Sequence, residues 1–129
     1  MNIFMTGGTG FVGSHLTEHL TALGHGVTVL TRKPPFGQPS TGISYVTGDP
    51  AYGGPWQQAA ADHEALINLA GASIFKRWSD DYKKVILQSR LDTTRNLTEA
   101  AGRPGSSVKV ILSASAVGYY GSRGDQELA

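Results

Sequence analysis

The sequence predicts an α/β fold in which helices cover both faces of one parallel, doubly wound sheet. Short apolar runs of strand length alternate along the chain with segments of helical periodicity, an order typical of parallel sheets. The first apolar run also leads directly into a glycine-rich turn and then into a helix. Since 129 residues correspond to about one domain, we expect a single domain over residues 1–129.

Five strands are expected in this sheet, each a short run rich in apolar and β-branched residues. They cover residues 2–6, 27–30, 43–47, 65–69 and 108–112. Their alternation with helices predicts the spatial order 3-2-1-4-5. Three prolines between residues 33 and 40 exclude regular structure there and predict a surface loop.

The helices are predicted from apolar spacing and from residues at their ends. Residues 11–23 read as a helix that ends at Gly24, and residues 55–63 as a short helix with a proline in its first turn. A long helix begins after Ser79, a favourable N-cap residue, and ends at Gly102. The apolar positions of the first helix are Val12, Leu16, Leu20 and Leu23.

The composition excludes several classes of protein. The chain contains no cysteine, which rules out disulfides, thiolate catalysis and iron–sulfur clusters. A formal net charge of +1 gives no electrostatic basis for binding nucleic acid or an anionic membrane. The apolar runs are too short to span a membrane, and the first residues lack the basic region and cleavage site of a signal peptide. We therefore expect a cytoplasmic domain with no nucleic-acid or membrane partner.

Residues 6–13, TGGTGFVG, have the features of a phosphate-binding loop, because a strand leads into them and a helix leaves them. Gly7 permits a sharp turn, Gly10 leaves the main chain open to a pyrophosphate, and Gly13 lets the helix pack closely on the strand. The N–H groups at the helix start then face the phosphates. This context favours dinucleotide binding over a tight turn that holds no ligand.

The loop has the spacing G-x-x-G-x-x-G, and together with Thr6 it resembles the extended short-chain dehydrogenase/reductase superfamily. Residues 48–50, GDP, resemble the Gly-Asp element near the adenine, and residues 68–72, NLAGA, resemble the fourth-strand end that lies against the cofactor. Residues 112–121, LSASAVGYYG, resemble the Ser-rich end of the fifth strand. Residues 76–78 and 89–95 resemble a subgroup labelled NAD-dependent epimerase/dehydratase or sugar-nucleotide epimerase.

The resemblance implies a Rossmann-type fold of which this chain is the N-terminal portion, without the C-terminal substrate-binding part. It also implies ancestry in hydride transfer on a sugar nucleotide or similar hydroxyl compound. The residues expected to contact the cofactor at the glycine loop and at the resembling segments are Thr6, Gly7, Gly10, Phe11, Val12, Gly13, Asp49, Leu69, Ala70 and Gly71.

The end of the second strand indicates which nicotinamide cofactor is preferred. An NAD site usually has a carboxylate there, about 20 residues beyond the loop, to accept the ribose 2′-hydroxyl. The chain instead has Thr31, Arg32 and Lys33 at this place. Because a guanidinium makes forked, charge-assisted bonds to a phosphate, we expect a preference for NADP over NAD. Arg32 would be the main contact of the 2′-phosphate, with Thr31 or Lys33 assisting.

The superfamily transfers hydride with a Ser, a Tyr and a Lys, the last two spaced four residues apart. Ser115 is the first candidate for the Ser and Ser113 the second, since ligands bind at the carboxyl ends of parallel strands. No Tyr in the chain has a Lys four residues later, and Arg123, four residues after Tyr119, cannot readily shuttle protons. Three alternatives remain open: an oxidoreductase or epimerase, a non-catalytic dinucleotide-binding module, and an inactive fragment of a longer enzyme.

Two further expectations concern metals and assembly. His15 and His19 are one helical turn apart, but no third ligand accompanies them, so no metal site is predicted. The fifth strand would present an exposed apolar edge at the end of the sheet. This edge predicts a homo-oligomer through strand 108–112, or coverage of that strand by residues 118–129 or by further chain.

Overall fold

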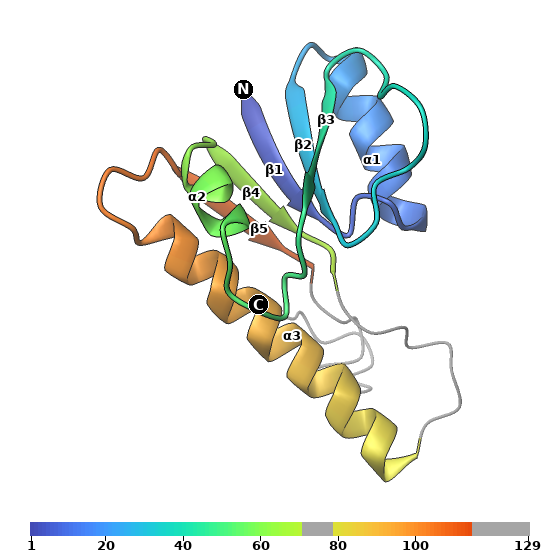
Figure 1. The fold of residues 1–129 in the computed structure, drawn as a ribbon, viewed down its shortest axis with the longest axis vertical. Coiled ribbons are helices and arrows are strands. Elements are labelled where there is room, and N and C mark those ends of the chain that lie inside the picture. The colour runs from blue at the N-terminus through green and yellow to red at the C-terminus, as the bar shows by residue number, and fades with distance from the viewer. Residues whose placement is uncertain (71–78, 115–129) are drawn as a thin grey trace, which may run out of the picture.

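The computed structural model describes residues 1–70 and 79–114 of the chain. Its strands are β1 (Asn2–Thr6), β2 (Gly26–Thr31), β3 (Ile43–Thr47), β4 (Ala65–Asn68) and β5 (Val110–Ser113). Its helices are α1 (Phe11–Ala22), α2 (Trp56–Ala61) and α3 (Asp80–Ala101). Helix α1 lies on one face of the sheet, while α2 and α3 lie on the other (Figure 1).

The strands lie in the order β3-β2-β1-β4-β5, which confirms the predicted order, and all neighbouring strands are parallel. Thr6, the last residue of β1, is in register with Leu30 of β2 and with Asn68 of β4. The chain winds outward from β1 in both directions, so β1 and β4 flank the point at which the winding reverses. Ligands of open α/β sheets bind at the carboxyl ends of the strands at this point.

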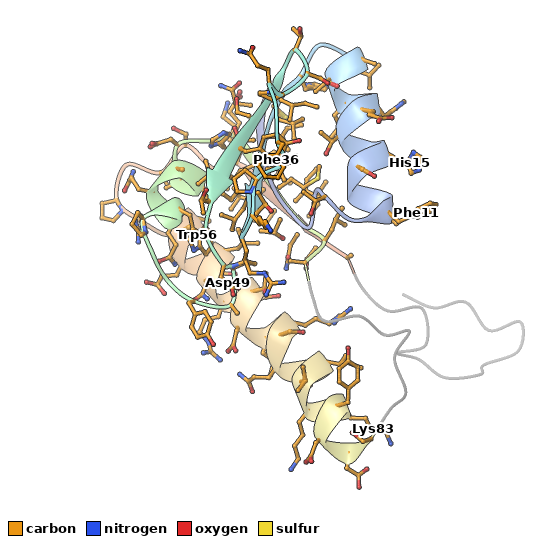
Figure 2. The ribbon with its side chains drawn as sticks, turned by 45° about the vertical axis from the view of Figure 1, so that its right-hand side comes forward. Phe11, His15, Phe36, Asp49, Trp56 and Lys83 are labelled. Atoms are coloured by element: carbon orange, nitrogen blue, oxygen red, sulfur yellow. The ribbon has the colours of Figure 1, made fainter. Side chains whose placement is uncertain are left out.

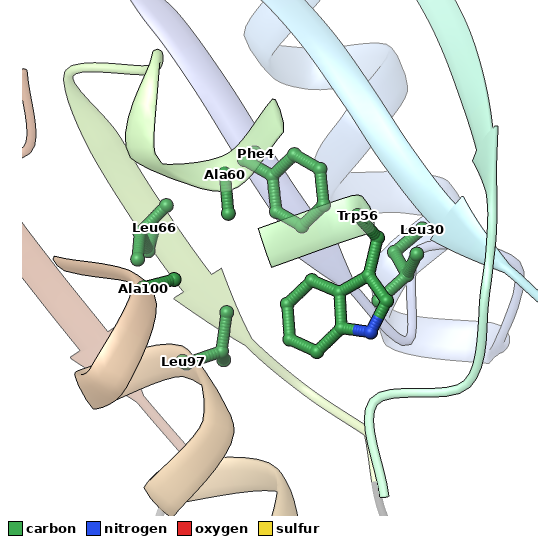
Figure 3. Close-up of a cluster of buried hydrophobic side chains, with 7 residues drawn as sticks. All are labelled: Phe4, Leu30, Trp56, Ala60, Leu66, Leu97 and Ala100. Carbon is green, nitrogen blue, oxygen red and sulfur yellow. The ribbon is translucent and has the colours of Figure 1, made fainter. Parts of the chain in front are cut away.

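Side chains of β1 alternate between the two faces of the sheet and thereby contribute to two cores. Phe4 points toward α2 and α3, where its ring stacks on Trp56 with centroids 6.1 Å apart. Figure 3 shows this cluster, to which Leu66 and Leu97 belong. On the opposite face, Ile3, Met5, Val27, Val29, Ala65 and Ile67 form a second buried cluster, and Leu16 and Leu20 of α1 pack against it.

Helix α1 approaches the sheet through small residues rather than through its full set of apolar ones. Gly13 and Thr17 are its buried residues, and the Thr17 hydroxyl lies 2.7 Å from the Gly13 carbonyl and 3.4 Å from the Met5 sulfur. Val12 and Leu23, which share the helical spacing, are each 62% exposed. Because α1 comes closest to the sheet at Gly13, the face of α1 that is buried contains Gly13 and Thr17, and Val12 lies outside that face.

The predicted boundaries of α3 agree with the structure, whereas α2 is shorter than the predicted range 55–63 and β5 is shifted from the predicted range 108–112. The N-cap prediction is confirmed, since the Ser79 hydroxyl accepts the Tyr82 N–H at 3.0 Å, and Gly102 is the C-cap of α3. Strand β5 begins two residues later than predicted, because the Val108 N–H donates to the Ser106 hydroxyl within its own turn.

Among residues 1–70 and 79–114, no helix combines the length and apolarity needed to cross a bilayer.

Candidate functional site

A cavity of about 660 Å³ opens at the carboxyl ends of the strands. Its size falls in the range of about 300–1,000 Å³ that is common for small-molecule sites. Loops after β1, β2, β3 and β4 line it, together with one face of α3. The lining residues are Gly7, Thr9, Gly10, Leu30, Thr31, Arg32, Lys33, Asp49, Pro50, Ala51, Tyr52, Leu69, Ala70, Ser89 and Thr93.

The glycines of the loop after β1 are required by close backbone approaches. Gly7 has φ +71°, a conformation that favours glycine, and a Cβ there would lie 2.6 Å from the Leu69 carbonyl carbon. A Cβ at Gly13 would collide with the Gly7 carbonyl oxygen. The loop is therefore packed against the end of β4 on one side and against α1 on the other, with no room for side chains at either position.

The amino end of α1 is open to a ligand. Its N-cap residue is Gly10, which provides no capping side chain, and its first turn contains no acidic residue. The first-turn N–H groups of Phe11, Val12 and Gly13 have no acceptor within the helix, so this end carries partial positive charge. The side chains of Phe11 and Val12 are largely exposed and do not line the cavity. Any contact from these two residues to a ligand would thus come from the main chain.

A hydrogen-bond network fixes the ends of β1 and β4 beneath this loop. Thr6 is fully buried, and its hydroxyl donates to Asn68 Oδ1 at 2.7 Å while accepting the Ala70 N–H at 3.3 Å. Asn68 Nδ2 lies 3.4 Å from the hydroxyls of both Thr94 and Ser113. Thr6 therefore positions the cavity wall at Ala70 rather than reaching into the cavity itself.

The end of β2 brings two cations to the cavity. The Thr31 hydroxyl lies 3.3 Å from both the N–H and the carbonyl oxygen of Lys33, which closes a short turn around Arg32. Both Arg32 and Lys33 are exposed and line the cavity. No acidic residue accompanies them at the end of β2, so this part of the cavity suits an anion.

The loop after β3 supplies a further part of the cavity wall and a single carboxylate. Asp49 Oδ1 accepts the Ala51 N–H at 2.9 Å, and the Asp49 carbonyl accepts the Tyr52 N–H at 3.1 Å. Asn96 of α3 donates to the Pro50 carbonyl at 2.8 Å, which joins this loop to α3. Figure 2 shows Asp49 beside α3, with Trp56 at the far side of the loop.

Most of the residues predicted to contact a cofactor are brought together by the structure. Eight line the cavity: Gly7, Gly10, Thr31, Arg32, Lys33, Asp49, Leu69 and Ala70. Four other described residues of this set do not line the cavity: Thr6, Phe11, Val12 and Gly13. Gly71 and Ser115 lie outside the described residues.

Seven lining residues were not anticipated: Thr9, Leu30, Pro50, Ala51, Tyr52, Ser89 and Thr93. Thr9 lies between two predicted glycines, and Pro50 to Tyr52 directly follow Asp49, so proximity in sequence could have indicated them. Ser89 and Thr93 share one face of α3, and the Thr93 hydroxyl donates to the Ser89 carbonyl at 2.7 Å. Only the packing of α3 on the sheet brings this pair to the cavity.

Ser113 borders a second hollow instead of the main cavity. This hollow measures about 390 Å³ and is lined mainly by apolar side chains, including Leu16, Leu20 and Leu112. Leu69 borders both hollows. Within residues 1–70 and 79–114, no three His, Asp or Glu side chains gather closely enough to hold a metal ion.

The fold and the cavity together define a Rossmann-type α/β domain with a glycine-rich loop at its first strand–helix junction. Comparison with known proteins identifies the family. The family model described as "NAD dependent epimerase/dehydratase family" matches residues 3–128. The chain therefore belongs to the NAD-dependent epimerase/dehydratase family, within the extended short-chain dehydrogenases/reductases.

Individual relatives agree with this assignment. Epimerase family protein YfhF of Bacillus subtilis (strain 168) is 41% identical over 122 residues, which cover 95% of this chain and 40% of YfhF. Human epimerase family protein SDR39U1 (isoform 2), crystallised with NADPH, is 34% identical with a TM-score of 0.69, over 93% of this chain and 38% of that one. MoeE5, in complex with UDP-glucose and NAD, is 25% identical with a TM-score of 0.75, over 95% and 39%. The chain thus spans about 40% of the length of YfhF.

Proposed function

We propose that this chain binds a nicotinamide dinucleotide in the cavity at the strand ends. The observation that carries the proposal is the uncapped amino end of α1, which opens beside Gly7 and Gly10 in the cavity wall. Unpaired N–H groups and the helix dipole favour a pyrophosphate at such a position. The NADPH and NAD in the related structures named above support the same ligand class.

The residues present fit this ligand. Cβ atoms at Gly7 and Gly13 would occupy the space that the loop needs to stay close to β4 and α1. Main-chain N–H groups of the first turn of α1 would hold the pyrophosphate, and Arg32 with Lys33 would hold the adenosine ribose end. Asp49 would lie near the adenine. A bound nicotinamide ring supplies or accepts a hydride.

We further propose that NADP(H) is preferred over NAD(H). A 2′-phosphate at the end of β2 would meet Arg32 and Lys33, and no carboxylate there would repel it. The turn closed by the Thr31 hydroxyl holds the main chain on either side of Arg32, which limits the main-chain entropy that is lost when Arg32 binds a phosphate.

Parallel titrations with NADPH and NADH, followed by the fluorescence of the reduced nicotinamide, test both proposals. We expect tighter binding of NADPH, and an increase of about tenfold or more in its Kd for Arg32→Ala, because a charge-assisted bond contributes roughly 1.5–3 kcal/mol. The NADH affinity should change little. Arg95→Ala is the matched control, since Arg95 pairs with Asp92 on α3 and does not line the cavity. Equal affinities for the two cofactors would contradict the NADP preference, and no binding of either would contradict the proposed function.

The proposed activity of the complete protein is that of an oxidoreductase or epimerase acting on a sugar nucleotide or similar hydroxyl compound. Family membership and the UDP-glucose bound to MoeE5 support this class. Ser115 is the proposed substrate-binding hydroxyl and Ser113 the second candidate. No Tyr of the given sequence is followed four residues later by a Lys, which for these 129 residues favours two alternatives, a dinucleotide-binding module without catalysis or an inactive fragment of a longer enzyme. Two assays of the complete protein separate the alternatives: NADPH oxidation with a panel of ketones detects an oxidoreductase, and interconversion of UDP-sugar epimers, which is redox-neutral, detects an epimerase. Only the first hypothesis predicts turnover in one of these assays that Ser115→Ala lowers.

We also propose self-association through the edge of β5. Val110, Ile111 and Leu112 are 39%, 38% and 56% exposed, and β5 is the edge strand of the sheet in the described part of the chain. An exposed apolar edge favours pairing with a second strand. Sedimentation should detect dimers that Ile111→Lys abolishes. A monomer at all concentrations would contradict self-association and favour coverage of β5 by residues 118–129 or by further chain.

A further inference from the structure

The cavity wall formed by residues 49–52 indicates how the purine of a dinucleotide would be held. This inference rests on the proposed dinucleotide binding. In a Rossmann-type site the pyrophosphate lies at the first strand–helix junction and the adenosine ribose at the end of the second strand. The base then lies beyond β2, next to the loop after β3. In this chain that loop is the segment from Asp49 to Tyr52, which lines the cavity throughout.

This segment has no main-chain donor available for the edge of a base beyond Asp49. Pro50 lacks an N–H altogether. The Ala51 N–H donates to Asp49 Oδ1 at 2.9 Å, and the Tyr52 N–H donates to the Asp49 carbonyl at 3.1 Å. A base at this wall therefore finds no main-chain N–H from residues 50–52 for its ring nitrogens, so contact with the face of the base is the main interaction that these three residues can offer.

The backbone at Tyr52 is held in place from both sides. The Tyr52 carbonyl accepts the indole N–H of the buried Trp56 at 3.0 Å. The neighbouring Pro50 carbonyl accepts the Asn96 amide at 2.8 Å, and the Asn96 carbonyl in turn accepts from Gln57 Nε2 at 3.0 Å. The position of residue 52 is thus set by α2 and α3 before any ligand binds.

The Tyr52 side chain, in contrast, contributes little to the packing of the core. It is 72% exposed, and it belongs to neither buried cluster. Tyr52 is the one aromatic residue among the described residues that line the cavity. An exposed aromatic ring on a fixed backbone is a suitable surface for stacking a base, because little conformational entropy is lost on contact.

We propose that the Tyr52 ring forms the wall on which the purine of the dinucleotide stacks. Arg32, which follows β2 and lines the same cavity, contacts the ribose end of the same nucleotide. The contact depends on the aromatic face and not on the phenol hydroxyl, so phenylalanine can replace tyrosine here. Stacking also tolerates changes at the edge of the base, since every purine presents the same kind of face.

Titration of the chain with NADPH and with 2′,5′-ADP, which contains the purine and the 2′-phosphate but no nicotinamide, tests this proposal. For Tyr52→Ala we expect the Kd of both ligands to rise by the same factor, about tenfold. Tyr52→Phe should bind both within about twofold of the original chain. Phe36→Ala is the matched control, because Phe36 is 98% exposed and does not line the cavity. Thermal unfolding of each variant verifies that the fold is intact.

The outcomes are distinguishable from those of the proposed function. If the unmodified chain binds neither of these ligands nor NADH, dinucleotide binding itself is overturned. If it binds both and Tyr52→Ala binds them equally well, the stacking wall is overturned while dinucleotide binding stands. A loss in Tyr52→Phe as large as in Tyr52→Ala would assign the contact to the hydroxyl and would overturn stacking as well.

Discussion

Thr6 and Asn68 join the carboxyl ends of the two central strands through a buried hydrogen bond of 2.7 Å between their side chains. Thr6 is fully buried and Asn68 is 6% exposed. Through its amide group, Asn68 also reaches Thr94 of α3 and Ser113 of β5 at 3.4 Å each. One polar pair thus connects β1, β4, β5 and α3 directly below the cavity.

Replacement of Thr6 by valine should destabilise the protein although the side-chain shape is kept. The substitution leaves Asn68 Oδ1 and the Ala70 N–H without their Thr6 partner in a buried place. We expect a loss of about 1–3 kcal/mol in the free energy of unfolding, the cost of an unsatisfied buried polar group. Urea denaturation measures it. Thr6→Ser keeps the hydroxyl and should lose less, so equal stability of the valine variant would refute the role assigned to this bond.

Gly13→Ala should disrupt the loop, because the added Cβ collides with the Gly7 carbonyl oxygen. We expect loss of NADPH binding together with a fall in the midpoint of thermal unfolding. The control is Gly102→Ala, where the nearest atoms, the Thr98 and Glu99 carbonyl oxygens, are at 3.5 and 3.7 Å and φ is −84°. Titration with NADPH and thermal unfolding of both variants measure these two effects. An alanine at position 13 that binds NADPH normally would contradict the packing argument.

Leu97→Ala should be among the more costly truncations in α3. Leu97 is 1% exposed and lies in the cluster with Phe4 and Trp56, so its removal leaves a cavity between helix and sheet. We expect a loss of about 2–5 kcal/mol in the free energy of unfolding. The same truncation at Leu87, which is 60% exposed on the same helix, should cost far less. Comparable losses in the free energy of unfolding at both positions, measured by chemical denaturation, would argue against the observed packing of α3 on the sheet.

The stability of the fold should depend on pH through Glu64. The Asn2 N–H, 3.1 Å from the Glu64 carboxylate, lowers the pKa of this group below its ordinary value of 4.5, partial burial opposes the shift, and Lys109 assists it. Because the pKa is lower in the folded state, the ionised carboxylate stabilises the fold above pH 4.5, and this contribution is lost as the pH falls through the lower value.

Comparison of the original chain with Glu64→Gln across the pH range measures this contribution. The variant should be less stable near neutral pH, and the difference should disappear in acid. Glu99→Gln alters an exposed carboxylate on α3 and is the control. A difference between the original chain and Glu64→Gln that is constant with pH would show that the charge of Glu64 does not contribute.

The residues that were predictable from sequence are those whose role follows from the local backbone. Gly7, Gly10 and Gly13 are recognisable because a strand–turn–helix junction requires small residues at that spacing, and Arg32 because it directly follows β2, the next strand. Tyr52 and Thr93 could not be found this way. The position of Tyr52 depends on bonds from Trp56 and from Asn96, and Thr93 reaches the cavity because α3 packs on the sheet through Leu97. No local sequence pattern predicts such contacts.

Among the described strands β1 comes first in the sequence, yet it is the central strand of the sheet, flanked by β2 and β4. Its pairing with β2 can form as soon as about 30 residues have left the ribosome, but its other edge stays unpaired until residues 65–68 emerge. The cavity draws on residues from Gly7 to Thr93, so it is completed only when α3 has docked. A nascent chain therefore exposes the second edge of β1 until β4 has emerged, and cofactor can stabilise the domain only after α3 has docked.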